Sequence, residues 1–288
     1  MDAAAEPAGE PRVSALRVTL TGAGGSLGTL LRPRLLSAGV ELCSTALDAL
    51  VPSAAHEKAA PEKIVIGDLR DPAVVDEILP GRDIVLHLAG ASTERPLDEI
   101  IDSNLRALHA LYEGARRHRV RRIVAASSNH AFGLHPAGAQ LGLDAAYRPD
   151  SLYGLSKAWG EAMARLYWDK HGIEAVSLRI GSALPRPSEI RHLSTWLGHD
   201  DLWRLVLAAL TAPDPGCMAI WGVSANSRAW WSNAGAERLG YIPRQNAEDW
   251  AAEILASSDD RNAVSRLHQG GSYAAEDWTP EASRPGAR

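Results

Sequence analysis

The chain has 288 residues, of which 45% are apolar and 23% charged, and its net charge is −5. This balance is ordinary for a soluble globular protein and gives no indication of nucleic acid as a partner. No stretch approaches the ~20 apolar residues of a membrane span, and Cys43 and Cys217 have neither CxxC nor metal-ligand spacing. We therefore expect a cytoplasmic protein with reduced thiols, no metal site and no membrane association.

The two ends of the chain differ from the rest. Residues 1–14 are rich in Ala, Pro, Gly and Glu and lack the basic start and apolar run of a signal peptide. We expect this segment to be a disordered tail, and the final residues, 279–288, to be disordered as well.

The first motif is a glycine-rich turn between a strand and a helix. Leu16–Thr21 is β-prone and leads into residues 22–28, where Gly22, Gly25 and Gly28 fit G-x-x-G-x-x-G. Glycine lets the backbone approach a pyrophosphate, and the helix N-terminus favours its negative charge. Leu27 stands where the G-x-G-x-x-G of many dehydrogenases would need glycine, and Pro33 should kink or shorten the helix.

Two further strands, 40–45 and 63–67, each precede an acidic residue. Asp48 lies 20 positions after Gly28, a spacing at which a carboxylate can bind a ribose diol and repel a 2′-phosphate, which favours NAD over NADP. The alternative is a solvated loop carboxylate. Asp68 and Leu69 follow the other strand, at the sheet edge where a cofactor lies.

Alternation of strands and helices continues to residue 128. Residues 83–90 read as an apolar strand in which His87 is a core or ladder residue, and 121–126 as a strand that ends at Ser127 and Ser128. The helix expected between them, over 96–120, contains Asn104, which on spacing alone could be a solvated polar position. Five such alternations predict an α/β fold of the Rossmann type, a doubly wound parallel sheet.

The chemistry concentrates in Tyr153-Gly-Leu-Ser-Lys157. Four residues of helix place Tyr153 and Lys157 on one face, so an ammonium can sit beside a phenol, favour the phenolate and turn it into a base. Ser128, 25 positions upstream, can hold a substrate oxygen beside them. The alternative is an ordinary amphipathic helix, which we expect to continue to about His171.

The amino-acid composition changes after a sixth predicted strand at 174–180. Pro, Arg and Trp become frequent, with six tryptophans between residues 196 and 250, which we interpret mainly as packing residues. No low-complexity linker marks the change. We therefore expect a core over 15–182 and a small C-terminal substrate-binding cap over 183–278, interleaved with that core.

Taken together in chain order, these motifs resemble the short-chain dehydrogenase/reductase superfamily over about residues 15 to 182. The resemblance is carried by the glycine turn, Asp48, Asp68, Gly90, Asn104, Ser128, Tyr153 and Lys157. The resemblance implies a bound NAD, a Ser-Tyr-Lys group supported by Asn104, and a homo-oligomer formed through helices 97–118 and 151–171. The cofactor contacts that it implies, besides Tyr153 and Lys157, are Gly22, Gly25, Ser26, Leu27, Gly28, Asp48, Asp68, Leu69, Leu88, Ala89 and Gly90.

Longer runs are similar to uronate dehydrogenases. They include 127–133, 148–157, 179–182, 191–196, 221–226, 240–248 and 268–271. This resemblance implies NAD-dependent oxidation of cyclic glucuronate or galacturonate at C1, which gives an aldarolactone.

The same resemblance assigns roles to individual residues. Tyr153 would remove the C1 hydroxyl proton, Lys157 would lower the pKa of Tyr153 and bind the nicotinamide ribose, and Ser128 would hold the reacting oxygen. Arg191 would grip the sugar carboxylate through two parallel bonds. The remaining substrate contacts would be Ser92, Asn129, His130 and Ser182.

Each substrate assignment has a structural alternative. Asn129 and His130 could only shape a turn, Ser182 could cap an element, and Ser92 could satisfy its own loop backbone. Arg191 could be a surface arginine tied to Asp200 or Asp201.

Two other functions compete with uronate oxidation. A nucleotide-sugar epimerase or dehydratase shares the Ser-Tyr-Lys group but needs a larger domain than the about 105 residues after Ser182. A non-catalytic NAD-binding sensor would typically lack the tyrosine.

Overall fold

The computed structural model describes residue 13 and residues 16–50, 61–256 and 262–279. Most of the two expected tails lies outside these residues. Val13 is described, and its burial in the hydrophobic core at 3% exposure contradicts its assignment to a disordered tail.

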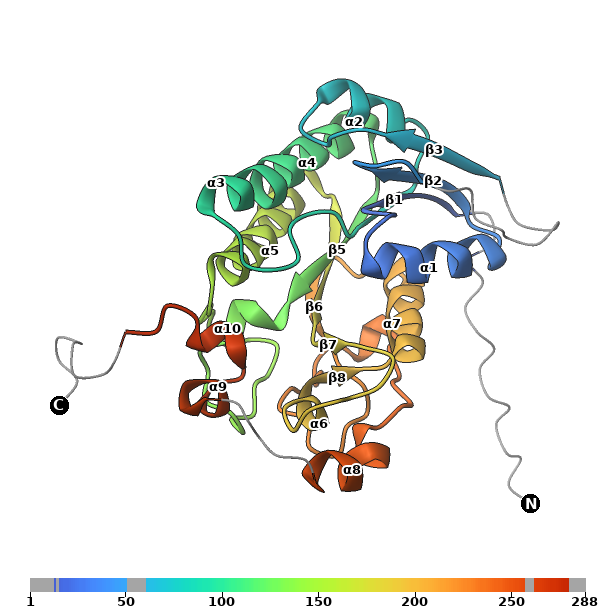
Figure 1. Ribbon diagram of the computed structural model, residues 1–288. Helices are drawn as coiled ribbons and strands as arrows, with labels where there is room; N and C mark the ends of the chain where they lie inside the picture. Colours follow the sequence, from blue (N-terminus) through green and yellow to red (C-terminus); the bar gives the residue numbers. More distant parts are fainter. Residues whose placement is uncertain (1–12, 14–15, 51–60, 257–261, 280–288) are drawn as a thin grey trace, which may run out of the picture.

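The centre of the molecule is a seven-stranded sheet in which every neighbouring pair is parallel, in the order β3-β2-β1-β4-β5-β6-β9 (Figure 1). The chain reverses direction across the sheet between β1 and β4, which is the doubly wound pattern predicted from the sequence. The strands are β1 (Arg17–Thr21), β2 (Glu41–Ala46), β3 (Glu62–Ile66), β4 (Ile84–His87), β5 (Arg122–Ser128), β6 (Glu174–Ile180) and β9 (Cys217–Gly222).

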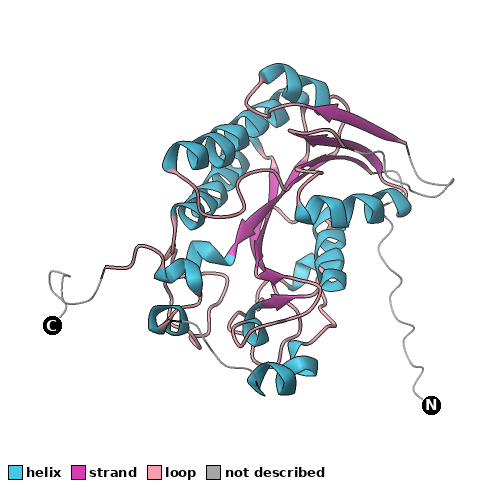
Figure 2. Ribbon diagram, in the orientation of Figure 1, coloured by secondary structure: helices cyan, strands magenta, loops and turns pink. Residues whose placement is uncertain are grey.

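Helices cover both faces of this sheet (Figure 2). On one face α1 (Ser26–Ser37) and α7 (His199–Thr211) pack into one apolar cluster with β1 and β6. On the other face α2 (Pro72–Ile78), α4 (Ala107–His118) and α5 (Leu152–His171) pack into a second. Burial on both sides explains why β6 contains only buried residues.

Helix α1 continues for four residues beyond Pro33. The proline therefore does not shorten the helix, contrary to one of the two outcomes expected from the sequence.

The helix expected over 96–120 has three parts: α3 (Leu97–Ile100), a π-helical segment η1 (Ile101–Arg106) and α4. A π segment inserts extra backbone into a helix and occurs often at functional sites. Asn104 lies within it and is only 6% exposed. Its interpretation as a solvated position is therefore wrong.

The last hundred residues both extend the sheet and build a lower lobe at its carboxyl end (Figure 1). Strand β9 and helix α7 belong to the main sheet layers, although both follow residue 182. The lower lobe contains β7 (Ser182–Ala183), α6 (His192–Thr195), β8 (Trp196–Leu197), η3 (Glu237–Leu239), η4 (Ala247–Trp250), α8 (Ala251–Ala256), α9 (Ala263–Leu267) and α10 (Ser272–Ala275), and a short helix η2 (Asn129–Phe132) follows β5.

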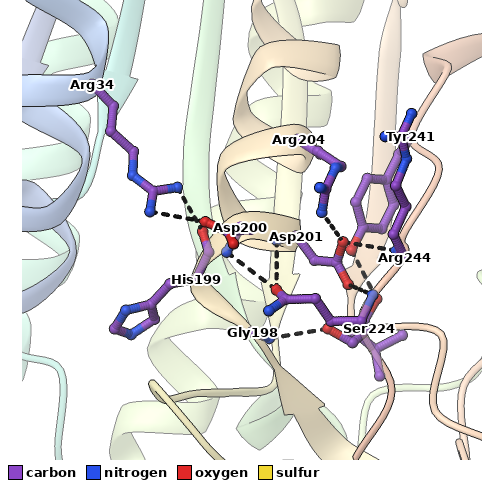
Figure 3. A network of polar contacts seen from close by, with 11 residues as sticks. Arg34, Gly198, His199, Asp200, Asp201, Arg204, Ser224, Tyr241 and Arg244 are labelled. Carbon is purple, nitrogen blue, oxygen red and sulfur yellow. Dashed lines mark hydrogen bonds and ion pairs between the residues drawn. The ribbon is translucent and has the colours of Figure 1, made fainter.

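The lobe is tied to α7 through a fully buried carboxylate, that of Asp201 (Figure 3). Its oxygens accept hydrogen bonds from the backbone nitrogens of Arg244 (2.8 Å) and Gln245 (2.9 Å) and from the Arg204 guanidinium (2.7 Å). A buried charge needs partners of this kind, so the loop at 244–245 is held firmly against the core.

Among the residues that the structure describes, no helix is both long and apolar enough to cross a bilayer.

Candidate active site

A cleft of about 680 Å³ opens at the carboxyl ends of the first four strands. This is the edge at which ligands bind in open α/β sheets. Eight of the residues predicted to hold the cofactor line it: Gly22, Gly25, Asp48, Asp68, Leu69, Leu88, Ala89 and Gly90.

The glycine turn closes tightly under this cleft. Gly22 has a φ of +72°, and a Cβ there would lie 2.6 Å from the backbone nitrogen of Ala89. A Cβ on Gly28 would lie 2.2 Å from the carbonyl oxygen of Gly22, so Gly28 serves the packing of α1 on the turn. Ser26, Leu27 and Gly28 form the first turn of α1 and are not among the residues that line the cleft.

The acidic residues at the far wall differ from each other. Asp48 is exposed at the end of β2. Asp68 is bound by the guanidinium of Arg70 at 2.7 Å, and this hydrogen-bonded partner lowers the pKa of the Asp68 carboxyl. The hydroxyl of Thr45, a buried residue of β2 that also lines the cleft, has no hydrogen-bond partner among the described residues. The free hydroxyl, the close backbone approach and the cleft volume together fit a dinucleotide.

Tyr153 lies in the first turn of α5 and is 8% exposed. Burial raises the pKa of Tyr153 to about 12, although a hydrogen bond with the Ser128 hydroxyl acts to lower it. Electrostatic interactions with Tyr273 and Asp150 raise it further. The structure thus brings Ser128 and Tyr153 together, as predicted.

Lys157 lies one turn later, with its Nζ 5.4 Å from the centre of the Tyr153 ring and 3.0 Å from the carbonyl oxygen of Ala126. Burial lowers the pKa of the Lys157 ammonium to about 8. Lys157 is not among the groups that shift the pKa of Tyr153, so the predicted lowering is not seen in this structure. The reason is that Lys157, with a pKa of about 8, has already lost its charge in the pH range where Tyr153, with a pKa of about 12, would ionise.

A small internal cavity of about 20 Å³ lies beside Lys157 and is lined by His87, Asn104 and Glu161 among others. It is large enough for a single water molecule. His87 is bonded to the Thr21 hydroxyl at 2.8 Å, and burial lowers the pKa of its imidazole to about 3. It is a core residue, as the sequence indicates.

Asn104 connects the cleft to α5. Its side chain accepts a hydrogen bond from the Ala91 nitrogen (2.7 Å) and donates to the Ala91 carbonyl (3.1 Å) and to the Ser156 hydroxyl (2.9 Å). A Cβ on Gly90 would come within 2.6 Å of the Asn104 oxygen. Asn104 therefore supports the loop after β4 and the helix that carries Tyr153 and Lys157.

The start of α5 is capped from two directions. Ser151 accepts a hydrogen bond from Gly154, and the Glu94 carboxylate accepts from the backbone nitrogens of Leu152 (3.1 Å) and Tyr153 (2.8 Å). These contacts satisfy three of the amide groups left open at a helix N-terminus.

A second polar cluster surrounds Arg191, which is 7% exposed. Its guanidinium donates to the Gln269 carbonyl (2.6 Å), the Ser182 hydroxyl (3.1 Å) and the side-chain oxygen of Asn129 (2.8 Å), when that amide is oriented so that its nitrogen donates to Ile180. Asp200 and Asp201 pair instead with Arg34 and Arg204. The alternative of a surface arginine tied to those two aspartates is therefore wrong.

His130 lies between the two clusters. Its Nδ1 is 2.7 Å from the Asp150 carboxylate, and its ring stacks on Tyr273 at 4.0 Å and meets Tyr153 edge-on at 5.8 Å. Ser92 is exposed, and no hydrogen bond of its side chain is seen among the described residues.

Sequence reasoning missed four residues that complete the site: Glu94, Asp150, Gln269 and Tyr273. Asp150 and Gln269 stand inside the runs 148–157 and 268–271 that resemble uronate dehydrogenases, so their place in the sequence was a usable signal. Glu94 and Tyr273 carry no such signal, because each reaches the site only through the tertiary fold.

The fold and the site define an NAD-type Rossmann enzyme with a Ser-Tyr-Lys group. In agreement, residues 18–197 match the model of the NAD dependent epimerase/dehydratase family. The chain belongs to this family and, within it, to the uronate dehydrogenases.

The second assignment rests on relatives that match most of the chain. The uronate dehydrogenase of Pseudomonas syringae pv. tomato is 40% identical over 262 residues, covering 90% of this chain and 93% of the relative. That of Agrobacterium fabrum is 42% identical over 260 residues, covering 89% and 96%. A crystal structure of a uronate dehydrogenase variant from Agrobacterium tumefaciens, complexed with NAD, superposes with a TM-score of 0.85 at 40% identity and covers 90% of this chain and 97% of that one.

Proposed function

We propose that the protein is an NAD-dependent dehydrogenase that oxidises the cyclic form of a hexuronate, glucuronate or galacturonate, at C1 to the aldarolactone. The observation that carries this proposal is the pairing of two clusters: Ser128, Tyr153 and Lys157 at one end, and the buried Arg191 with Asn129 and Ser182 at the other. The first suits proton removal from an alcohol, and the second suits a carboxylate.

In this reaction Tyr153 takes the proton of the C1 hydroxyl while the C1 hydrogen leaves as hydride. A bound NAD would supply the hydride acceptor, and the positive charge of its nicotinamide ring would favour the tyrosinate. Ser128 donates a hydrogen bond to the reacting oxygen, and Lys157 binds the nicotinamide ribose. Asp48 holds the adenosine ribose, which favours NAD over NADP.

Arg191 gives the reaction its substrate class. A guanidinium can bind a carboxylate through two parallel charge-assisted bonds, whereas a neutral sugar offers only hydroxyls. Asn129, His130, Ser182 and Ser92 are proposed to bind the ring hydroxyls or the carboxylate.

The experiment is a comparison of NADH formation with glucuronate, galacturonate, glucose and galactose, and then with NADP in place of NAD. We expect turnover with the uronates and NAD alone. Replacement of Arg191 by Met should lower kcat/KM for uronates by at least ~100-fold, about 3 kcal/mol, because a charge-assisted bidentate contact is lost. R186M changes an arginine that is 65% exposed and is the matched control. Equal rates on neutral sugars would contradict the proposal.

A nucleotide-sugar epimerase or dehydratase is distinguished by its cofactor balance. Such an enzyme reoxidises its NADH within each cycle, whereas uronate oxidation releases NADH in proportion to product. Accumulation of NADH without any nucleotide sugar therefore favours the dehydrogenase.

Replacement of Tyr153 by Phe separates the enzyme from a non-catalytic NAD-binding sensor. The variant lacks only the phenol oxygen, so it should lose at least ~1,000-fold in kcat while the Kd for NAD, measured by calorimetry, stays within about twofold. Unchanged turnover would contradict the role given to Tyr153.

We further propose that the enzyme is a cytoplasmic homo-oligomer. Both cysteines are free, as reduced thiols would be. Leu97, Leu155 and Leu166 are exposed on α3 and α5, where subunit contact was predicted. Sedimentation of the purified protein would test the oligomeric state.

A further inference from the structure

Asp150 is a buried carboxylate at the meeting point of three segments of the site. Its side chain is 0% exposed. A Cβ on Gly133 or Gly270 would lie 1.7 Å or 1.9 Å from its Oδ2, so only glycine leaves room for the carboxylate between the turn after β5 and the C-terminal segment. The third segment is α5, whose N-cap follows Asp150 directly.

The hydrogen bonds of this carboxylate determine which imidazole nitrogen of His130 carries the hydrogen. Oδ2 lies 2.7 Å from His130 Nδ1, and Oδ1 accepts a hydrogen bond from the Ser151 hydroxyl at 2.7 Å. The Asp150 carboxylate also helps to raise the pKa of Tyr153, as a nearby negative charge does. Because a carboxylate accepts hydrogen bonds, the contact with Oδ2 selects the tautomer in which Nδ1 carries the hydrogen, and in that tautomer Nε2 is an acceptor.

The ring has little freedom to turn away. It is stacked on Tyr273 at 4.0 Å with 27° between the planes, and its side chain is 15% exposed. Nε2 has no hydrogen-bond partner among the described residues, and the ring lies 5.8 Å from that of Tyr153. A lone pair is thus left open next to the catalytic group.

We propose that Asp150 is a positioning residue for substrate recognition: it holds His130 in the Nδ1–H tautomer, so that Nε2 accepts a hydrogen bond from a ring hydroxyl of the uronate. This proposal rests on the proposed function and specifies which group of the site binds a ring hydroxyl of the substrate. A purely structural Asp150 would fix the turn before α5 without acting through His130.

The direct test is NMR of the free protein labelled with ¹⁵N-histidine, since protonated and unprotonated imidazole nitrogens have distinct shifts. H130Q identifies the His130 signals by their loss. We expect an unprotonated Nε2 in the wild type, and a gain of Nε2–H in D150A, which removes the acceptor for Nδ1. An Nε2–H tautomer in the wild type would overturn the proposal, whether or not any uronate is oxidised.

The second test is kinetic. D150A should raise KM for the uronate by roughly tenfold, the effect of one hydrogen bond, with a smaller change in kcat and none in KM for NAD. D150N keeps a hydrogen-bond acceptor of the same shape. Across the wild type, D150N and D150A, the KM for the uronate must therefore rise as the fraction of the Nδ1–H tautomer of His130 falls. D169A, at the exposed far end of α5, is the matched control.

A double-mutant cycle separates positioning from structure. If Asp150 acts through His130, D150A adds nothing to the KM of H130Q. Additive effects, or a KM that does not follow the tautomer, would overturn the proposal. Thermal unfolding and NAD binding show whether each variant is folded. If D150A is not folded, D150N and D150S are compared in its place.

Discussion

At the scale of single residues, Lys157 carries an energetic cost that depends on pH. Its pKa is lowered from 10.5 to about 8, so between these values the unfolded chain binds the proton that the folded chain has lost. The free energy of unfolding must then rise with pH across this window. The cost below pH 8 is at most about 3 kcal/mol, because part of the side chain still borders a cavity.

We therefore expect K157M to be more stable than the wild type at pH 7, by up to about 2 kcal/mol after the loss of the hydrogen bond to Ala126. The advantage should shrink as pH rises from 8 to 10, when the wild-type lysine becomes neutral. Denaturant unfolding at four pH values measures this difference, with K170M, an exposed lysine at the end of α5, as the control. A difference that is independent of pH would contradict the shifted pKa.

At the scale of elements, the start of α5 sets the position of Tyr153. Glu94, 58 residues before Leu152, accepts from two backbone amides there. E94Q removes the charge that complements the helix N-terminus and weakens one of these bonds, so it should cost about 1 kcal/mol of stability.

Because the same contact holds the backbone of Tyr153, E94Q should also lower kcat several-fold. D98N, an exposed neighbour in α3, provides the comparison in both assays. Loss of stability without any change in kcat would limit Glu94 to a capping role.

The secondary-structure elements also show which features of the site can be predicted from the sequence. Tyr153, Lys157 and Ser128 were predictable because one helical turn and one strand end fix their relation, and β6 occupies the expected residues 174–180. Strand β4 ends at His87, three residues before the predicted end, because the chain leaves the ladder to line the cleft. The contacts of Glu94 and Tyr273 join segments far apart in sequence, and no local pattern encodes them.

At the scale of the whole molecule, the cleft at the carboxyl ends of the first four strands and the polar cluster around Arg191 are built from different parts of the chain. No residue after 107 lines the cleft among those described. The cluster around Arg191 instead includes Gln269, and the segment 267–270 runs along 133–139 through bonds such as Gly270 to Gly133 (2.8 Å) and Ala137 to Leu267 (2.8 Å).

A chain that stops before Asn262 should therefore bind NAD with nearly the Kd of the full protein yet lose uronate oxidation by at least ~100-fold. Calorimetry with NAD and NADH formation measure the two properties separately, and circular dichroism shows whether the sheet is intact. G270A tests the same expectation with a single substitution, since the added Cβ would collide with the Asp150 carboxylate. Parallel loss of NAD binding would mean that the two sites are not independent.

The same arrangement fixes an order of events on the ribosome. Every described residue that lines the NAD cleft has been synthesised by residue 107, and Lys157, proposed to bind the nicotinamide ribose, follows 50 residues later, but Gln269 and Tyr273 are among the last described residues to be made. Domains form from the N-terminal side during synthesis. A nascent chain would therefore complete its dinucleotide pocket well before its sugar pocket, and the cofactor, rather than the substrate, is the ligand able to stabilise the unfinished protein.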